Sequence, residues 1–377
     1  MSGPPVNAPL LGRSRIKRTS RLVAVNLGLL LAGMIVVELI FGGWVFGENY
    51  GTLVIPKNVT RVFDVEKLYG GGRILYKRDA HGLRGRYESL AAIDILAIGG
   101  STTNEIFIDD DATWTAVIAR EFKAAGHPVT VVNAGVDGQS TIGNLKNFDL
   151  WFPKIPGLRA RYVLALLGVN DAAVVESGED VLTGPLRLSK QDRMVDLLRP
   201  IRQYLINNSA LYALFRNLRG MLRARDAKLI HGTNSYAGTQ WRAPSTPPDI
   251  ERKARELKRG LDYYGQRLRE LTRRIRDFGA EPIYVTQHRP SYRVRDGRVL
   301  GRVGADGKVD LSEYETLMAV NGRTMAVCRD VKAICIDLAS ELFFDDGDHY
   351  DEVHTSPKGS EKIGKHLFGK FRRLFIK

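Results

Sequence analysis

A serine, an aspartate and a histidine in this chain of 377 residues have the surroundings expected of a proton-relay system. Ser101 directly follows Gly99 and Gly100 in the run GGST, where two glycines allow a sharp turn of the backbone. Asp351 precedes His354 by three residues in the run DEVH, so its carboxylate could reach Nδ1 of the imidazole. Nε2 could then accept the proton of a serine hydroxyl, which is a weak nucleophile without a base. These residues predict acyl transfer through a serine nucleophile.

Two further runs carry groups that could stabilise an oxyanion. The run NAGVDGQST contains Gly138, whose backbone N–H could donate a hydrogen bond, and Gly135 is the alternative glycine. The run GVND contains Asn170, whose side-chain amide could also donate. With the backbone N–H of Ser101, they would form an oxyanion hole of three donors. Glycine and asparagine are also common in ordinary turns, so each run alone is a weak signal.

Structural interpretations of the neighbouring residues remain open. Ser101 or Thr102 could cap a helix, with Glu105 completing a capping box from Thr102. His288 follows an expected strand, and we expect a structural role for it. The acidic run near the C-terminus lacks the full spacing of an EF-hand loop, so we expect no metal site there. Its members are Asp345, Asp346, Asp348 and Asp351.

A strand–helix alternation predicts the framework that would bring these runs together. Five short β-branched or aliphatic runs are typical of parallel strands covered on both faces, which indicates an α/β fold of three layers. Sites in such sheets form at the carboxyl ends of strands, where the serine, glycine and asparagine runs all lie. The strands are expected at 93–98, 129–133, 162–167, 283–286 and 333–338.

Amphipathic segments between the strands are expected to be helical. Residues 114–125 end before a glycine, and residues 250–278 place apolar side chains at alternating steps of three and four. A last helix should begin with Ser356 as its N-cap and Pro357 at its first position. Its buried face would consist of Ile363, Leu367 and Phe371.

A long insertion, at about 172–249, separates the third and fourth expected strands. Its part 187–225 is basic and amphipathic, and a proline-rich loop at 241–248 follows. It could be an ordinary helical cap on the core, a lid, or a membrane-surface helix, because basic residues beside an apolar face suit anionic lipid. The apolar residues are Leu197, Ile201, Leu205, Leu211, Leu214, Phe215 and Leu218.

The apolar run 22–46 is long enough to cross a hydrocarbon core about 30 Å thick, and Glu38 is its one charged residue. The positive-inside rule predicts that residues 1–21 stay in the cytoplasm and that the rest lies outside, on the periplasmic side in a Gram-negative cell. A cleaved signal peptide is the alternative, but its apolar region would be shorter, about 7–15 residues. The basic residues before the run are Arg13, Arg15, Lys17, Arg18 and Arg21.

Composition narrows the class of partner. With 44% hydrophobic and 26% charged residues, the chain is typical of a folded globular protein. Its net charge of +14 suits an anionic partner such as phospholipid headgroups or acidic polysaccharide. We expect no nucleic acid, because zinc-finger, RNP-like and helix-turn-helix patterns are all missing. Cys328 and Cys335 could be buried thiols, or a disulfide if the domain lies outside the cytosol.

In their order along the chain, the four runs resemble the SGNH hydrolase superfamily, the GDSL-like lipases and esterases. The resemblance spans about 93–370 without the insertion, and GGST with the upstream run GLRG at 82–85 is similar to membrane-anchored bacterial members. Gly100 stands where the GDS motif has aspartate. The resemblance implies a three-layer α/β/α, flavodoxin-like fold and no cofactor. It also implies site roles for Ser101, Gly138, Asn170, His354 and, as the acid of the triad, Asp351.

The resemblance further implies a serine esterase, because members of the family hydrolyse esters or related acyl bonds. The expected location outside the cytoplasm suits an acetyl or acyl ester of an envelope glycan or lipid as its substrate. An O-acyltransferase with the same triad is one alternative, and a catalytically silent, membrane-tethered binding protein is the other. The expected divisions of the chain are a cytoplasmic N-terminus at 1–21, a transmembrane anchor at 22–46, an irregular segment at 47–90 and the hydrolase domain at 91–377.

Overall fold

The computed structural model divides the chain into two compact units, which are described separately. One unit comprises Met1–Thr52 with Ser189–Gly220, and the other comprises Leu53–Leu188 with Met221–Lys377. The described residues between 53 and 90 therefore share a unit with the sheet, whereas residues 208–215 and 218–219 belong with the N-terminal helix. The structure describes residues 12–44, 53, 55–178, 208–215, 218–219, 231–232, 236, 239–304 and 307–376.

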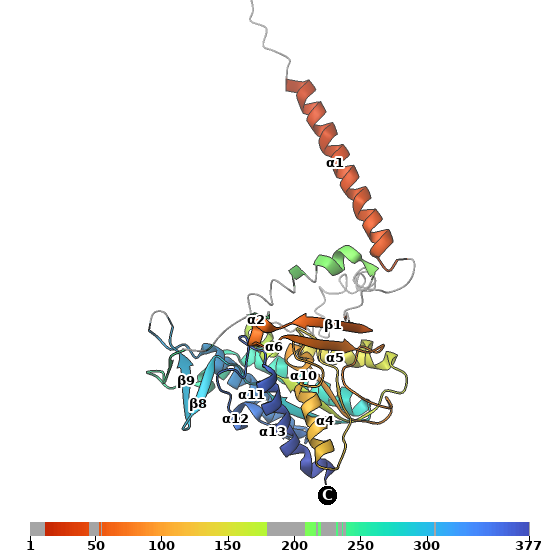
Figure 1. Cartoon of the computed structure of the whole chain (residues 1–377). Coiled ribbons are helices and arrows are strands. Elements are labelled where there is room, and N and C mark those ends of the chain that lie inside the picture. The colour runs from red at the N-terminus through yellow and green to blue at the C-terminus, as the bar shows by residue number, and fades with distance from the viewer. Residues whose placement is uncertain are drawn as a thin grey trace, which may run out of the picture. The chain divides into compact units, whose positions relative to one another are not determined.

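The larger unit is built on a five-stranded parallel sheet, as the strand–helix alternation predicted (Figure 1). The strand order is β10-β7-β5-β3-β4, so β3 and β5 lie side by side in the interior of the sheet. All five expected strands are present, and their ends agree to within two residues. They are β3 (Ile93–Gly99), β4 (Val131–Asn133), β5 (Ala160–Leu167), β7 (Glu281–Thr286) and β10 (Ile334–Ile336).

Helices cover both faces of this sheet and give three layers. Along β3, Ile95 and Ala97 pack in one apolar cluster, whereas Leu96 and Ile98 pack in the other. Successive side chains of a strand point to opposite faces, so a buried strand must be apolar at every position. The cluster with Ile95 contains residues of α4 (Trp114–Ala124) and α13 (Pro357–Phe375). The cluster with Leu96 contains residues of α5 (Thr141–Leu150), α10 (Lys258–Asp277) and α11 (Ser312–Asp330).

Helix ends follow the capping signals of the sequence. Ser356 is the N-cap of α13 and accepts a hydrogen bond from the backbone N–H of Gly359, with Pro357 at the first helical position. The expected helix 250–278 is present as α9 (Ile250–Glu256) and α10, because Leu257 takes a turn conformation between them. The interruption is local, since N–H groups on both sides still bond to the fourth preceding carbonyl.

Two small antiparallel sheets correct the sequence interpretation. The segment 47–90 was expected to be irregular, yet its described part contains a hairpin, and the first residues of the expected loop 241–248 form a strand. The hairpin was missed because neither strand shows a clear apolar pattern. Its first strand, at 59–64, is largely exposed, and its second strand, at 73–78, buries the side chain of Arg78. The sheets comprise β1 (Val59–Asp64) with β2 (Arg73–Arg78), and β6 (Trp241–Arg242), β8 (Tyr292–Arg295) and β9 (Arg298–Arg302).

Only parts of the expected insertion 172–249 are described. Its first residues belong to α6 (Val169–Ser177), which directly follows β5. Helical residues recur at 210–215 and 218–219. The apolar positions Leu197, Ile201 and Leu205 lie outside the described residues.

The N-terminal unit contains the long helix α1 (Gly12–Phe41). Its segment Ser20–Phe41 has a mean hydropathy of 2.4 and is long and apolar enough to cross a membrane. In the other unit, Cys328 at the end of α11 and Cys335 in β10 form a disulfide with an Sγ–Sγ distance of 2.00 Å. The structure therefore favours the disulfide over two free thiols.

Candidate active site

The candidate nucleophile lies at the sharp turn between β3 and the short helix α3 (Ser101–Asn104). Gly99 has φ +156°, and a Cβ there would meet the carbonyl oxygen of Leu166 at 2.9 Å. A Cβ on Gly100 would collide with the side-chain amide of Asn170. Both positions therefore require glycine, and the turn they form sets Ser101 at the start of the helix, where its side chain is 6% exposed.

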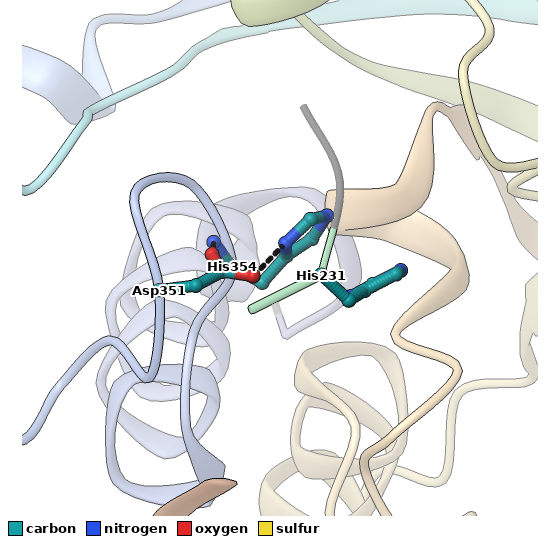
Figure 2. Close-up of side chains that lie close together, drawn as sticks. All are labelled: His231, Asp351 and His354. Atoms are coloured by element: carbon teal, nitrogen blue, oxygen red, sulfur yellow. Dashed lines mark hydrogen bonds and ion pairs between the residues drawn. The ribbon is translucent and has the colours of Figure 1, made fainter. Parts of the chain in front are cut away.

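Ser101, His354 and Asp351 form one continuous hydrogen-bonded array. His354 Nε2 lies 2.7 Å from Ser101 Oγ, and its Nδ1 lies 2.7 Å from Asp351 Oδ2. The other carboxylate oxygen of Asp351 accepts the backbone N–H groups of Val353 and His354, at 2.8 and 2.6 Å. These backbone bonds fix the carboxylate in the loop before α13, where Figure 2 shows its bond to the imidazole.

The electrostatics of this loop favour an ionised carboxylate. Burial alone would raise the pKa of Asp351, but its hydrogen bonds and the nearby charge of His354 outweigh burial and lower that pKa. A carboxylate can only accept hydrogen bonds, so Nδ1 of His354 is assigned as the donor to it. The unprotonated Nε2 then faces the serine hydroxyl, which is the arrangement a general base needs.

The two remaining predicted donors lie in the loops after β4 and β5. Asn170, in the first turn of α6, donates its side-chain amide to the carbonyl of Gln139 at 2.8 Å. Gly138 has φ +74° in the turn after β4. The alternative, Gly135, already donates its N–H to Asn133 Oδ1 at 2.9 Å. Gly138 therefore remains the candidate oxyanion donor of the two glycines.

Glu105 does not form a capping box with Thr102, which was the open alternative, because α3 ends before it and Glu105 adopts a left-handed conformation with φ +51°. Its carboxylate instead accepts the backbone N–H of Trp114 at 2.9 Å and the hydroxyls of Thr355, at 3.2 Å, and Ser360. Burial raises the pKa of Glu105 to about 7, against the opposing effect of these hydrogen bonds. The side chain ties the serine turn to the histidine loop.

Arg84, in the run GLRG, holds the loop that follows Ser101. The buried guanidinium of Arg84 donates to the backbone carbonyls of Asn104, Glu105 and Ile108, at 3.1 Å for Glu105 and 3.2 Å for Ile108. It also pairs with the carboxylate of Asp110. One arginine therefore satisfies several carbonyls of the loop that follows the nucleophile, which a point-like ammonium could not do.

His231 was not predicted as a site residue, yet it lies against the array (Figure 2). Its ring stacks on the imidazole of His354, with centroids 3.9 Å apart and an interplanar angle of 24°. Its Nδ1 is 2.8 Å from the hydroxyl of Tyr350, and the next N–H, of Gly232, donates to Asp351 Oδ2 at 3.3 Å. Burial and the neighbouring His354 lower the pKa of His231 to about 4. No periodicity or motif surrounds this histidine in the sequence.

His231, Asp351 and His354 are also close enough to suggest a metal site, since one ligand atom from each lies within 4.8 Å of the others. The geometry favours the proton relay instead. Stacked imidazole rings direct their lone pairs side by side rather than toward a common point, and metal ligands must converge. Both nitrogens of His354 and Nδ1 of His231 are already in hydrogen bonds.

The remaining candidates take structural roles among the described residues. Lys362 pairs with Asp345 and Asp348, and Arg293 pairs with Asp346, so the acidic run is bound by cations of the protein. His288 is buried, as expected for a structural residue. Its ring lies against Tyr292, Phe344 and His349.

Comparisons with known proteins identify one family and several similar solved structures. The model of the GDSL-like Lipase/Acylhydrolase family matches residues 97–362. Similar solved structures include TesA (13% identity, TM-score 0.40, covering 74% of this chain and 99% of that one). Another is the carbohydrate acetylesterase Est24 from Sinorhizobium meliloti (12% identity, TM-score 0.37, covering 75% of this chain and 100% of that one). A third is the aryl esterase of M. smegmatis (13% identity, TM-score 0.37, covering 75% of this chain and 100% of that one). Among curated proteins, none matches the sequence.

Proposed function

The chain belongs to the GDSL-like lipase/acylhydrolase family and is a serine hydrolase of the SGNH type, and from this premise we propose that it cleaves an acetyl or acyl ester of an envelope glycan or lipid. The observation that carries the proposal is the array Ser101–His354–Asp351, with 2.7 Å at each of its two contacts. A serine hydroxyl on a histidine, itself held by a carboxylate, is the arrangement that activates serine for acyl transfer.

The proposed reaction has two steps. Ser101 Oγ attacks the ester carbonyl carbon as its proton passes to His354 Nε2. The oxyanion would be held by the backbone N–H groups of Ser101 and Gly138 and by the amide of Asn170. When the intermediate collapses, the imidazolium gives its proton to the departing alcohol and leaves an acyl-serine. Water, deprotonated by His354, then releases the acid and restores the serine.

We further propose that α1 stays as an anchor, with its N-terminus in the cytoplasm and the sheet unit outside. The basic residues before the apolar segment support this orientation under the positive-inside rule. The disulfide between Cys328 and Cys335 supports it independently, because disulfides persist in oxidising compartments such as the periplasm. Esters of the cell envelope are the substrates within reach of such an enzyme.

Transfer of the acyl group to a sugar hydroxyl is a second candidate. The observation that favours it is the burial of the array: His354 is 3% exposed, and His231 covers one face of its ring. Limited access of water would slow hydrolysis of the acyl-enzyme and favour an acceptor held in the site.

The test uses the full chain in detergent with a fluorophosphonate probe and p-nitrophenyl acetate. We expect labelling and ester cleavage in the wild type and neither in Ser101→Ala or His354→Ala, whereas Ser89→Ala, at an exposed serine, should behave as wild type. A folded wild type that neither labels nor cleaves would contradict the proposal. Adding a glucosamine oligosaccharide separates the candidates, because acetylated sugar formed without net acetate release would favour transfer.

A further inference from the structure

The single acidic residue of the apolar segment has its hydrogen-bond partners in the N-terminal unit itself. Glu38 Oε1 accepts from the hydroxyl of Ser209 at 2.6 Å and from the N–H of Leu211 at 3.1 Å. Glu38 Oε2 accepts from the N–H of Ala210 at 3.0 Å and from the indole of Trp44 at 2.8 Å. The partners of Glu38 therefore come from the end of the span and from a segment about 170 residues further along the chain.

The backbone joins the same two places. The N–H of Gly43, just beyond α1, donates to the carbonyl of Asn208 at 2.8 Å. Residues 210–215 are helical, and the first N–H groups of a helix have no partner within it. The carboxylate of Glu38 accepts two of these groups and stands where the helix dipole favours negative charge. A carboxylate in an apolar segment would otherwise be costly, so capping a second helix gives it a physical role.

The helix that Glu38 caps carries its large apolar side chains outward (green in Figure 1). Ala213 is 3% exposed, and Ala210 is also buried, whereas Leu214 is 56% and Phe215 60% exposed. At 100° per residue, the outward residues fall within one face of about 100°. An exposed face of this kind in a helix attached to a membrane span calls for an apolar partner. The face comprises Leu211, Leu214 and Phe215.

We propose that the helix beginning at residues 210–215 is interfacial and that its apolar face enters the headgroup–acyl boundary of the bilayer that α1 crosses. Two observations identify lipid as the occupant: the helix begins in hydrogen bonds to the end of the span, and arginines follow each other along the same stretch. They suit anionic headgroups and are Arg216, Arg219, Arg223 and Arg225. The proposal rests on α1 being a retained anchor and is independent of the ester chemistry.

The experiment places a polarity-sensitive fluorophore on the apolar face in a bilayer. Phe215→Cys is labelled with the NBD fluorophore in the full chain, in vesicles of phosphatidylethanolamine and phosphatidylglycerol. Both native cysteines are in the disulfide, so the introduced thiol can be labelled without reduction. The matched control is Asp111→Cys, at an exposed side chain of the sheet unit. We expect blue-shifted emission and severalfold stronger quenching by doxyl-labelled lipid at position 215 than at position 111.

The outcomes separate lipid from the other possible occupants. Equal emission and quenching at the two positions would overturn the proposal. A blue shift at position 215 without quenching by lipid would also overturn it, because the face would then be covered by protein, either this chain or a second copy. Flotation of the vesicles reports α1 as an anchor, and p-nitrophenyl acetate cleavage by the same sample reports the enzyme. Failure of either is thus distinguishable from failure of the interfacial helix.

Variants at the cap test the role of Glu38. In the Phe215→Cys background, Glu38→Ala should reduce quenching by doxyl lipid, because the helix loses the acceptors that hold its start to the span. Glu38→Gln keeps an oxygen acceptor and should retain part of the quenching. Glu88→Ala, at an exposed glutamate of the sheet unit, should leave it unchanged. Full quenching in Glu38→Ala would show that the cap does not position the helix.

Discussion

At the scale of single residues, the candidate site combines an array that we propose moves a proton with neighbouring groups of other proposed roles. The Ser101–His354–Asp351 array is bonded end to end, so the proposed reaction would need little reorganisation to start. Asn170 bonds to the carbonyl of Gln139, whereas His231 stacks on the ring of His354. One would contribute to the oxyanion, and the other covers the ring of the base.

Asn170→Ala tests the oxyanion hole. Removing one donor from an oxyanion hole typically lowers turnover by about 10²–10³-fold, and we expect a fall of that size in kcat with KM little changed. Steady-state cleavage of p-nitrophenyl acetate measures both constants. Asn170→Asp, which has nearly the same shape but no N–H to donate, should lose at least as much. A kcat within twofold of wild type in both variants would remove Asn170 from the mechanism.

His231 is expected to position the imidazole rather than to exchange protons. Its pKa of about 4 keeps the ring neutral at physiological pH, and a stacked aromatic ring contributes about 0.5–1.5 kcal/mol beyond its buried area. We expect His231→Ala to lower kcat about 2- to 10-fold and His231→Phe, which keeps the stack, to recover most of it. Rates measured from pH 5 to 9 would show whether the acid limb of the profile moves in the alanine variant only. A loss as large in phenylalanine as in alanine would point to a proton-transfer role.

At the scale of elements, the site depends on contacts that join helices and strands far apart in sequence. Glu105 connects the turn of α3 to the first residue of α4 and to the loop and first turn of α13. The helices themselves approach each other closely where a glycine permits it. Two predictions follow from these contacts between elements.

Glu105→Gln should change the pH dependence of stability. The pKa of Glu105 is raised from 4.5 to about 7, so its stabilising effect is fully present below pH 4.5 and is lost as the pH rises through 7. Glutamine stays neutral throughout. The free energy of unfolding of the variant, relative to that of the wild type, should therefore rise by about 3 kcal/mol between pH 4.5 and 7 and stay constant above pH 7. Thermal unfolding of both proteins across this range measures the difference. A constant difference would mean that folding does not raise the pKa of Glu105.

Gly260→Ala should destabilise the contact between α10 and α6. A Cβ at position 260 would collide with the backbone carbonyl of Val175, which cannot move without shifting α6. We therefore expect the free energy of unfolding to fall by about 1–3 kcal/mol. Gly322→Ala is the matched control in α11, where a Cβ has nothing within 4 Å. It should be neutral or stabilising by up to about 1 kcal/mol. Chemical denaturation of the two variants measures the contrast, and equal effects would contradict the packing argument.

At the scale of the whole molecule, local signals predicted most of the framework, but contacts between distant segments were not predictable. The five strands are short apolar runs that any buried parallel sheet requires, and the spacing of Asp351 and His354 fits one loop. The alternative of a capping box at Glu105 does not hold because such a box needs a helix that continues, whereas α3 has four residues. His231 and the cap from Glu38 to Ser209 depend on tertiary contacts without a sequence pattern.

The sequence separation of 253 between Ser101 and His354 also has a consequence in time. A ribosome adds roughly 5–20 residues per second, so the proposed nucleophile is made about 13–50 s before its proposed base. Under the proposed mechanism, the nascent chain holds throughout that interval a serine that cannot yet be activated, whatever esters surround it. Any product of premature termination before His354 would be inert for the same reason. Catalytic competence would therefore arise only after His354 has been added to the chain.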